Sequence, residues 1–466
     1  MKIIIVGDGK VGFTLAEHLS QEEHDITVID TNDAALRHAS EALDVMCVKG
    51  NGASISALRE SGVDAADVLI AATSMDEVNM VCCLTAKRLG AKYTIARVRN
   101  VEYAMELSLL KEALGIDLVI NPENAAAAEI ARLLRFPPAA NLETFCRGRV
   151  ELIGFRGREE DFLVGHPLSA QSGQLQSLPM LFCAAERAEG DVVIPDGSFV
   201  PQVGDRLYLI GQPTGLTAFF RLLGRHNPRC RNVFLVGGGR IAHYLTAILE
   251  RLGIHVKIIE RSLDRCRHLS EVLPKATVIC GDGTDQELLD SENLSSCDAF
   301  VALTDRDEDN LIISLYAAQL GLSKVITKSN RQNYNRIAQA VGLDSIISPK
   351  QLATSHILQV VRGMQNSQGS VMNALYRIAD GAAEAMEFTV TASTRHLGTP
   401  LRDLSLKPGI LVAVVARGGE IIIPEGSTSI QEGDSVILIS RDRRLQDLND
   451  IYDEGEHTFS APGGMS

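Results

Sequence analysis

The feature that most constrains this chain is a stretch of about thirty residues that occurs twice. In the first copy, an apolar run over residues 3–6 leads into a G-x-G-x-x-G loop, a helical pattern and a second apolar run ending at Asp30. The second copy repeats this order from Val233 to Glu260. The displacement between the copies is the same at the glycines and at the acid. Loop and carboxylate therefore keep one spacing in both copies.

This order of elements predicts a nucleotide-binding strand, loop and helix. Gly7 permits a tight turn after a buried strand, Gly9 lets a pyrophosphate approach the backbone, and Gly12 lets helix and strand pack closely. Ala242 replaces the third glycine in the second copy. The free N–H groups and the positive dipole end of the helix face the phosphates. The acid after the second strand accepts hydrogen bonds from the ribose hydroxyls.

Strand and helix patterns continue to alternate after each copy, which predicts an α/β fold with a doubly wound parallel sheet in each half. The strands expected in the first half are 3–6, 26–30, 44–48, 67–73, 93–98 and 117–120, with helices over 104–114 and 125–134. A β-rich module over residues 150–210 recurs at 385–440 with the same turn spacing. The chain is thus expected to be a tandem duplication, each half a Rossmann-like domain followed by a small α+β domain.

The expected domain boundaries follow from these patterns. They are 1–135 and 230–363 for the Rossmann-like domains, 140–212 and 372–447 for the small domains, and 448–466 for a flexible tail. The segment from Pro213 to Pro228 is expected to link the halves. The tail turns acidic and then rich in Gly, Pro and Ser from about Asp453, which is typical of frayed termini.

Composition excludes several classes of function. The chain has 466 residues and a formal net charge of −14, whereas a nucleic-acid binder needs a basic surface. No run approaches the roughly 18 apolar residues of a membrane span, and the first residues lack the apolar core of a signal peptide. A cytoplasmic location is therefore expected. The nine cysteines form no C-x-x-C, and those in apolar runs, such as Cys47, Cys183 and Cys280, are expected to be small buried hydrophobes.

The ligand of a doubly wound sheet lies past the carboxyl ends of the strands, beside the first strand. Thr73 and Ser74 end the fourth strand of the first half, where a hydroxyl can reach the distal half of the ligand. Arg97 and Arg99 end the fifth strand and could hold a phosphate or carboxylate, or could instead form surface salt bridges. No arginine follows Asp30, so its carboxylate favours NAD(H) over NADP(H).

The second loop differs in ways that bear on its ligand. Arg240 lies inside the glycine loop, Arg261 follows the acid, and Lys328 replaces Arg97. A lysine lacks the planar fork of an arginine. The second site is therefore expected to prefer a different nucleotide or to bind more weakly.

The candidate cofactor-binding residues come from both copies. They are Gly7, Asp8, Gly9, Lys10, Val11, Gly12, Asp30, Thr73, Ser74, Arg97, Arg99, Gly237, Gly238, Gly239, Arg240, Ile241 and Glu260. The sequence shows no Ser/His/Asp set, no metal-ligand cluster and no paired carboxylates in a suitable context. An acid/base residue for a dehydrogenase is not evident either, so no catalytic or metal-binding residue is predicted and the chain is not expected to be an enzyme.

At these residues the chain resembles the TrkA family, the cytosolic nucleotide-binding subunits of bacterial Trk potassium-uptake systems, built from two RCK (regulator of K⁺ conductance) units. The resemblance rests on Lys2–Gly12, Asp25–Thr31, Asp76–Met80 and Ile95–Arg99, and on the tandem order of domains. It implies binding of NAD(H) and of ATP or ADP. It also implies a homo-oligomeric gating ring attached to the inner face of the membrane through a TrkH/TrkG-like potassium-translocating subunit.

By the same resemblance, both loops and acids, Thr73-Ser74 and Arg97 would contact nucleotide, and Arg99 is a candidate for an ATP γ-phosphate. Different nucleotides would favour different angles between the domains, and the ring would transmit that difference to the pore. Two alternatives stay open. One is an NAD-dependent oxidoreductase with a reduced catalytic domain, and the other is a free nucleotide sensor with a different partner.

Overall fold

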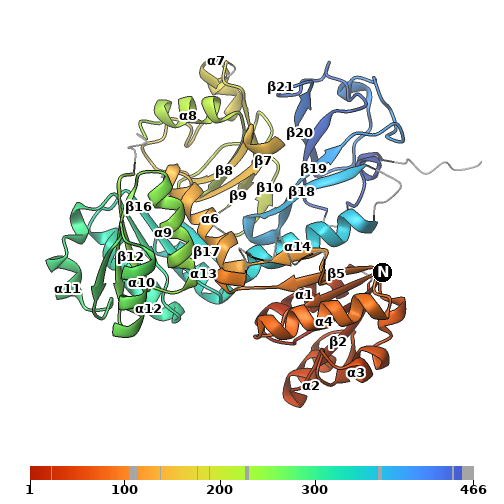
Figure 1. Cartoon of the computed structure of the whole chain (residues 1–466). Helices are drawn as coiled ribbons and strands as arrows, with labels where there is room; N and C mark the ends of the chain where they lie inside the picture. The colour runs from red at the N-terminus through yellow and green to blue at the C-terminus, as the bar shows by residue number, and fades with distance from the viewer. Residues whose placement is uncertain are drawn as a thin grey trace, which may run out of the picture. The chain divides into compact units, whose positions relative to one another are not determined.

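The structure is a computed structural model, shown in Figure 1. It describes residues 1–22, 24–103, 106, 111, 113–136, 138–175, 177–187, 189–225, 230–365, 370–442 and 445–453. The chain forms two compact units, and each takes one piece from each half of the duplication. Unit 1 consists of Met1–Leu142 and Gly224–Val361, and unit 2 consists of Glu143–Leu223 and Arg362–Ser466.

Unit 1 contains two parallel six-stranded sheets of the same topology. The first has the order β3-β2-β1-β4-β5-β6 and the second the order β14-β13-β12-β15-β16-β17, which is the strand order of dinucleotide-binding sheets. The first-half strands are β1 Lys2–Val6, β2 Asp25–Asp30, β3 Met46–Lys49, β4 Val68–Ala71, β5 Tyr93–Arg97 and β6 Leu118–Ile120. The second-half strands are β12 Asn232–Val236, β13 His255–Glu260, β14 Thr277–Cys280, β15 Ala299–Ala302, β16 Lys324–Lys328 and β17 Ser345–Ile347.

Helices connect these strands and cover both faces of each sheet (Figure 1). The first half has α1 Lys10–Ser20, α2 Asp33–Ala42, α3 Ile55–Glu60, α4 Asp76–Leu89 and α6 Pro122–Arg135. The second half has α9 Arg240–Arg251, α10 Leu263–Val272, α11 Gln286–Ser291, α12 Asp307–Gln319, α13 Gln332–Ala340 and α14 Pro349–Gln365. Because both faces are covered, a central strand such as β1 is continuously apolar, and Ile3, Ile4 and Ile5 are fully buried.

The two Rossmann-like domains contact each other within unit 1. Helix α6 of the first packs against α9 of the second, where Asn121 Nδ2 donates to the Tyr244 hydroxyl over 2.9 Å. The buried Lys324 donates to Ser345 Oγ over 2.7 Å and also to the carbonyl oxygen of Ala139. The Lys324 amino group therefore links the second sheet to the segment that follows α6.

Unit 2 contains two antiparallel five-stranded sheets that also share one topology. Their orders are β10-β9-β11-β8-β7 and β18-β19-β22-β20-β21, which match when one is read in reverse. The first consists of β7 Asn141–Phe145, β8 Val150–Arg156, β9 Met180–Glu186, β10 Val192–Val193 and β11 Arg206–Gly211. The second consists of β18 Val371–Ile378, β19 Ala383–Thr389, β20 Ile410–Arg417, β21 Glu420–Ile422 and β22 Ser435–Ser440.

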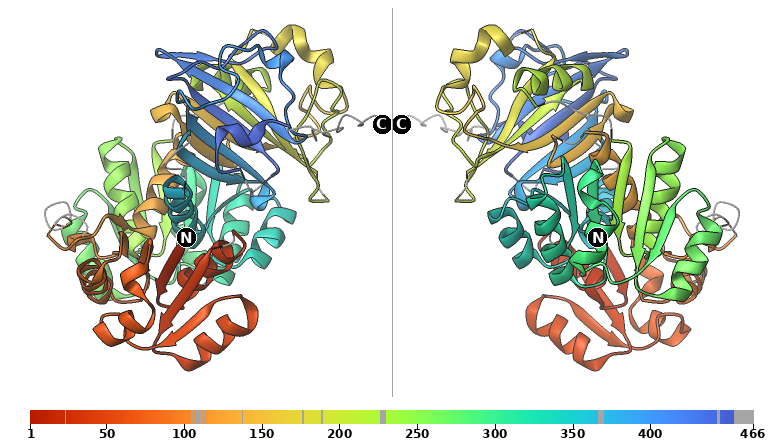
Figure 2. Two further views of the ribbon diagram at one scale, coloured as in Figure 1. Left: turned by 90° about the vertical axis from the view of Figure 1, so that its right-hand side faces the viewer. Right: turned by 90° about the vertical axis from the view of Figure 1, so that its left-hand side faces the viewer.

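These two sheets share a hydrophobic core. Phe145 and Tyr208 of the first sheet lie in one buried cluster with Ala385 and Ile437 of the second. Figure 2 shows the yellow strands of the first small domain beside the blue strands of the second. Polar contacts also cross between them. The Cys146 amide donates to a Glu387 carboxylate oxygen over 3.0 Å, the Ala379 amide donates to the Tyr208 hydroxyl over 3.0 Å, and the Tyr376 hydroxyl donates to the Thr144 carbonyl over 3.1 Å.

The predicted fold class, a tandem duplication of Rossmann-like and small α+β domains, is confirmed, but several local expectations need correction. The expected linker begins with a helix, α8 Pro213–Leu222, whose Phe219 and Phe220 are buried. Strand β7 was not expected from the sequence. The tail begins later than 448, because Leu448 and Ile451 are buried in a cluster of the second small domain.

Two expectations fall on residues that the structure does not describe. The helix expected over 104–114 lies largely outside the described residues, and so does the tail over 454–466. Within the described residues, no helix is long and apolar enough to cross a membrane. The remaining domain boundaries stay predictions.

Candidate functional site

Each glycine loop joins the first strand of its sheet to the following helix. Gly7 has a φ of +96° and Gly237 a φ of +101°, a left-handed conformation that glycine adopts without strain. A Cβ on Gly7 would also lie 2.9 Å from the backbone of Thr73, and a Cβ on Gly12 would lie 1.8 Å from the Gly7 carbonyl oxygen. Packing of the protein itself therefore requires glycine at these positions of the first loop.

The middle glycines have a different reason to be small. Gly9 and Gly239 precede α1 and α9 with φ values of −76° and −77°, which any residue adopts. No atom lies within 4 Å of the Cβ that a larger residue would add at either position. The N-cap residue makes no side-chain hydrogen bond at either helix start, so it leaves the first N–H groups of the helix to another acceptor. That arrangement suits an anionic ligand.

The two acids hold the glycine loops in place. Asp30 Oδ2 accepts a hydrogen bond from the Asp8 amide over 2.6 Å, and Glu260 Oε2 accepts one from the Gly238 amide over 2.8 Å. The second oxygen of each carboxylate accepts an amide two residues further on, at 2.8 Å in both halves. Loop and acid are thus coupled in the same way in both copies.

Both loops open into one cavity of about 1120 Å³ within unit 1. Of the predicted residues, it is lined by Gly7, Gly9, Lys10, Val11, Asp30, Thr73, Ser74, Arg97, Arg99, Gly238, Gly239, Arg240 and Ile241. Asp8, Gly12, Gly237 and Glu260 are not among the residues that line it. The sequence treats the loops as two sites, whereas the structure joins them.

Cations from both halves face this cavity. They are Lys10, Arg97 and Arg99 from the first half and Arg240, Arg265, Lys328 and Lys350 from the second. The carboxylates that line it are Asp30, Glu123 and Asp305. The excess of positive charge favours a polyanionic ligand such as a pyrophosphate or a nucleotide.

Arg97 is the best placed of these cations for an added ligand. Its Nη1 donates to the Ala72 carbonyl over 3.2 Å, but its Nε is buried without a hydrogen-bond partner. Burial lowers the pKa of the guanidinium, and the positive charges of Arg99 and Arg240 lower it further, while Glu123 and Asp76 partly offset them. A buried donor without a partner is costly, so an anion here would relieve both the unmet bond and the repulsion.

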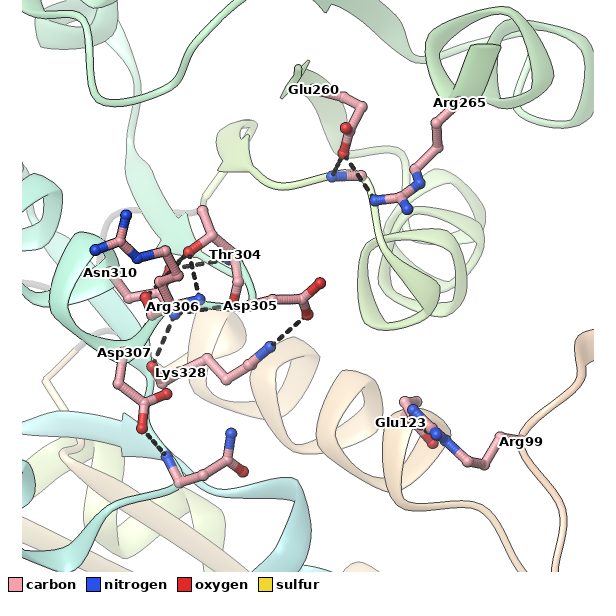
Figure 3. Close-up of polar contacts among 12 residues, drawn as sticks. Arg99, Glu123, Glu260, Arg265, Thr304, Asp305, Arg306, Asp307, Asn310 and Lys328 are labelled. Atoms are coloured by element: carbon pink, nitrogen blue, oxygen red, sulfur yellow. Dashed lines mark hydrogen bonds and ion pairs between the residues drawn. The ribbon is translucent and has the colours of Figure 1, made fainter. Parts of the chain in front are cut away.

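Arg99 is already paired. Its Nη2 lies 2.5 Å from Glu123 Oε1, a largely buried carboxylate, and its Nε donates to the same oxygen over 2.6 Å (Figure 3). The backbone amide of Arg99 donates to Asp76 Oδ2 over 2.8 Å. Of the two hypotheses for this arginine, the structure shows a salt bridge, and the predicted γ-phosphate contact would require Arg99 to share or leave it.

Thr73 is also engaged within the protein. Its hydroxyl donates to Asn79 Oδ1 over 2.7 Å, and Asn79 Nδ2 donates to the Arg97 carbonyl over 2.8 Å. The second half repeats this arrangement. The Thr304 hydroxyl donates to Asn310 Oδ1 over 2.8 Å, and Asn310 Nδ2 donates to the Lys328 carbonyl over 3.0 Å. The threonine therefore fixes the ends of two adjacent strands, while Ser74 keeps its place on the cavity wall.

The second half of the cavity carries two ion pairs, both shown in Figure 3. Arg265 Nη1 lies 3.4 Å from Glu260 Oε2, and Lys328 Nζ lies 3.6 Å from Asp305 Oδ1. The Asp305 side chain is 99% exposed, so this second pair is weak. Lys328 can therefore turn to an anion in the cavity at small cost.

Several lining residues were missed by the sequence analysis. Arg265, His268 and Leu269 come from α10, and Lys350 comes from the first turn of α14. The spacing of the first three, i, i+3 and i+4, marks one face of a helix. The sequence does not show that this face of α10 borders the cavity, so it could not identify these three residues as lining residues. Burial lowers the pKa of Lys350, and the nearby charge of Lys10 lowers it further, although Glu17 opposes this.

Asp8 is the predicted residue whose position differs most from expectation. It is 8% exposed and its Oδ1 is buried without a hydrogen-bond partner. Burial raises the pKa of this carboxyl to about 6, and the Asp30 charge adds to the rise, while His38 opposes it. Gly238 takes this place in the second loop. Among the described residues, no group of three or more His, Cys, Asp or Glu side chains could hold a metal ion.

Comparison with known families gives matches over both kinds of domain. The family model of the TrkA-N domain matches residues 3–122 and 233–349, and that of the TrkA-C domain matches residues 385–452. A Trk system potassium uptake protein TrkA from Halomonas elongata is 37% identical over 461 residues, covering 98% of this chain and 99% of the relative. A TrkA homolog from Methanosarcina mazei is 33% identical, covering 97% and 100%.

Solved structures match the fold over nearly the whole chain. The GsuK channel superposes with a TM-score of 0.63 at 21% identity, covering 94% of this chain and 76% of that one. The structure described as the GsuK channel bound to NAD gives a TM-score of 0.61 at 20% identity over the same shares. At this identity the likeness establishes the fold alone.

Proposed function

Since the chain belongs to the TrkA family of Trk potassium-uptake proteins, we propose that it is a nucleotide-binding regulatory subunit that gates a membrane potassium-translocating subunit and catalyses no reaction itself. The observation that carries the proposal is the shared cavity. Two helix N-termini and cations from both halves face one cavity. The middle glycines leave room for a ligand to approach the protein backbone.

The residues present fit a dinucleotide at the first loop. Gly7–Val11 would receive the pyrophosphate, Asp30 would hold the ribose, and Ser74 and Arg97 would meet the distal part. Asp30 ends β2 and is followed by Thr31 and Asn32 rather than by a cation, so a 2′-phosphate would meet a carboxylate there, which favours NAD(H). The structure described as the GsuK channel bound to NAD gives a precedent for this ligand in a related fold.

The second loop would hold an adenine nucleotide such as ATP or ADP. Gly237–Ile241 would receive its phosphates and Glu260 its ribose, with Lys328 replacing the arginine of the first half. Arg240 of the second half and Arg97 of the first half line the same cavity. A longer phosphate chain would meet cations of both domains, whereas a shorter one would meet fewer.

This difference suggests how nucleotides could regulate. A ligand that bridges the two Rossmann-like domains stabilises the arrangement in which both sets of cations reach it, and it shifts the equilibrium by its differential affinity for the two arrangements. In a homo-oligomeric ring on the cytoplasmic side of the membrane, that change would be passed to a TrkH/TrkG-like subunit.

The binding proposal is tested by thermal-shift titration of the full chain with NAD⁺, NADH, NADP⁺, ATP and ADP. A ligand at a hundred times its Kd stabilises by about 2.7 kcal/mol, which is readily measured. We expect NAD(H) to stabilise the wild type and Asp30→Ala to lose that effect, and we expect Glu260→Ala to lose the effect of the second ligand. Asp264→Ala, whose side chain is 96% exposed, is the matched control.

Equal stabilisation by NADP⁺ and NAD⁺, or no stabilisation by any nucleotide, would reject the assignment. Regulation is tested by potassium flux into proteoliposomes that contain a Trk-type membrane subunit with and without this chain. A flux that responds to nucleotide only when the chain is present supports the proposal. Consumption of NADH during these assays, seen as loss of its absorbance, would instead support an oxidoreductase.

A further inference from the structure

Two cysteines of the second half lie beside the acid that holds the glycine loop. Cys266 is on α10 and is 6% exposed, and Cys280 is the last residue of β14 and is exposed. The Cys266 thiol donates to the Glu260 carbonyl over 3.2 Å, and the Cys280 thiol lies 4.0 Å from the Arg261 carbonyl. The exposure of Cys280 corrects the expectation that it is a buried hydrophobe.

The sheet register brings the two thiols close together, because Glu260, whose carbonyl accepts from the Cys266 thiol, pairs directly with Cys280. Burial raises the pKa of the Cys266 thiol to about 11, and a hydrogen bond with Cys280 contributes to the rise. The Cys266 thiol of α10 lies at the carbonyl of the last β13 residue, and the Cys280 thiol of the neighbouring strand β14 lies at the next carbonyl.

The first half places a different pair of residues at this position. In the first sheet Asp30 of β2 lies opposite Lys49 of β3, and in the second sheet Glu260 of β13 lies opposite Cys280 of β14. Lys49 forms an ion pair with Asp33 of α2 over 2.9 Å, which ties that helix to its neighbouring strand. In the second half Cys280 takes the place of Lys49, and Cys266 takes the place of Leu36, which follows Asp33 by three residues on α2.

The helix that carries Cys266 is part of the cavity wall. Its Arg265, His268 and Leu269 face the cavity, and Arg265 reaches the Glu260 carboxylate. A covalent bond from Cys266 to β14 would fix the position of these three side chains. It would act on the second loop alone, because the first half has leucine and lysine where the second has the cysteines.

We propose that Cys266 and Cys280 form a reversible disulfide that ties α10 to β14 and changes the nucleotide affinity of the second loop. The disulfide stands on the geometry of the thiols, whereas its effect on affinity rests on the proposed function. The oxidant is a low-molecular-weight disulfide such as oxidised glutathione, and reduced glutathione reverses the reaction.

The chemistry proceeds by two thiol–disulfide exchanges. The exposed Cys280 thiol loses a proton, and its thiolate attacks one sulfur of the oxidant, which expels one thiolate and leaves a mixed disulfide. Cys266 then loses its proton to solvent, attacks the Cys280 sulfur and expels the second thiolate. The protein gives up two electrons and two protons, and the oxidant becomes two thiols.

The disulfide is tested on the full chain without nucleotide. Protein is equilibrated in glutathione buffers of graded oxidised-to-reduced ratio, alkylated and digested, and its peptides are identified by mass spectrometry. We expect a crosslink between the Cys266 and Cys280 peptides in wild type and in Cys297→Ser, a control thiol of the same domain, and none in Cys280→Ser or Cys266→Ser. The proposal would be overturned if wild type formed no crosslink and carried only a stable glutathione adduct on Cys280. A crosslink between separate chains would overturn it too.

The effect on affinity is measured by calorimetric titration of ATP and ADP into Asp30→Ala protein, which isolates the second loop. We expect oxidation to change the Kd by roughly fivefold or more, and reduction to restore it. An unchanged Kd in protein that carries the crosslink would refute the coupling. No binding to the reduced protein would refute the proposed function and leave the mass-spectrometric result standing.

Discussion

At the scale of single residues, Asp8 shows how a glycine loop can carry a titrating group. Asp8 is a buried residue of the first loop, its amide donates to Asp30, and Gly238 replaces it in the second loop. Burial of a carboxyl disfavours its charged form, and a second carboxylate nearby adds repulsion. The native state therefore holds the proton of Asp8 more tightly than the unfolded chain does.

This gives a signed prediction for stability against pH. Because the pKa of Asp8 is raised from 3.8 to about 6, its contribution to stability is largest at low pH and is lost as the pH rises through that interval. Asp8→Asn should remove this loss and raise the free energy of unfolding at about pH 8 by roughly 1–3 kcal/mol.

The measurement is urea denaturation at about pH 5 and about pH 8. Asp33→Asn is the control, because the hydrogen bond and charge of Lys49 lower the pKa of that exposed carboxyl. A variant Asp8→Asn that keeps the pH dependence of the wild type would show that Asp8 is not the titrating group.

At the scale of elements, glycines that look alike in the sequence motif have different structural roles in the strand–loop–helix units. Gly7 is required by a left-handed φ and by the nearby backbone of Thr73, whereas Gly9 faces open space. The same division holds for Gly237 and Gly239. The motif thus combines one glycine that the fold needs with one beside which the fold leaves open space.

Two alanine variants should separate these roles. Gly7→Ala should lower the free energy of unfolding by roughly 2 kcal/mol or more, because it adds left-handed strain to a backbone clash. Gly9→Ala should cost about 1 kcal/mol or less, since alanine is only a poorer N-cap. Its Cβ should nevertheless weaken nucleotide binding at the first loop. Denaturation and calorimetric titration measure the two effects, and unimpaired binding by Gly9→Ala would contradict this account.

At the scale of the whole molecule, like domains associate with like. The two Rossmann-like domains form unit 1, and the two small domains form unit 2, although neither pair is contiguous in the chain. Within unit 2, Tyr208 of the first small domain is fully buried and its hydroxyl accepts the amide of Ala379 in the second. That amide belongs to a residue with a φ of +51°, a strained position for alanine.

Tyr208→Phe should therefore weaken the association of the small domains. It leaves the Ala379 amide buried without its acceptor, which costs about 1–3 kcal/mol. Tyr316→Phe is the matched control, because it removes a hydrogen bond to Asp290 on an exposed surface and should change stability by less than about 0.5 kcal/mol. Equal stability of the two variants in urea denaturation would show that the buried contact contributes nothing.

The sequence by itself determined the duplication, both parallel sheets and the position of each glycine loop relative to its acid. These features depend on neighbours along the chain: apolar runs make buried strands, helical periodicity makes the covering helices, and glycines mark the turns. The same local patterns failed where packing overrides composition, as in α8, in β7 and in the buried residues at 448–451.

The tertiary structure decided what lies between distant parts of the chain. No local pattern encodes the contacts that join the two loops in one cavity and bring Arg240 and Arg97 to the same space. The same is true of the salt bridge of Arg99 and of the exposed thiol of Cys280. Such contacts are set by how helices and sheets bury their remaining apolar faces against each other. A loop motif therefore predicts a phosphate site, but only the packing of the two halves joins two such sites into one.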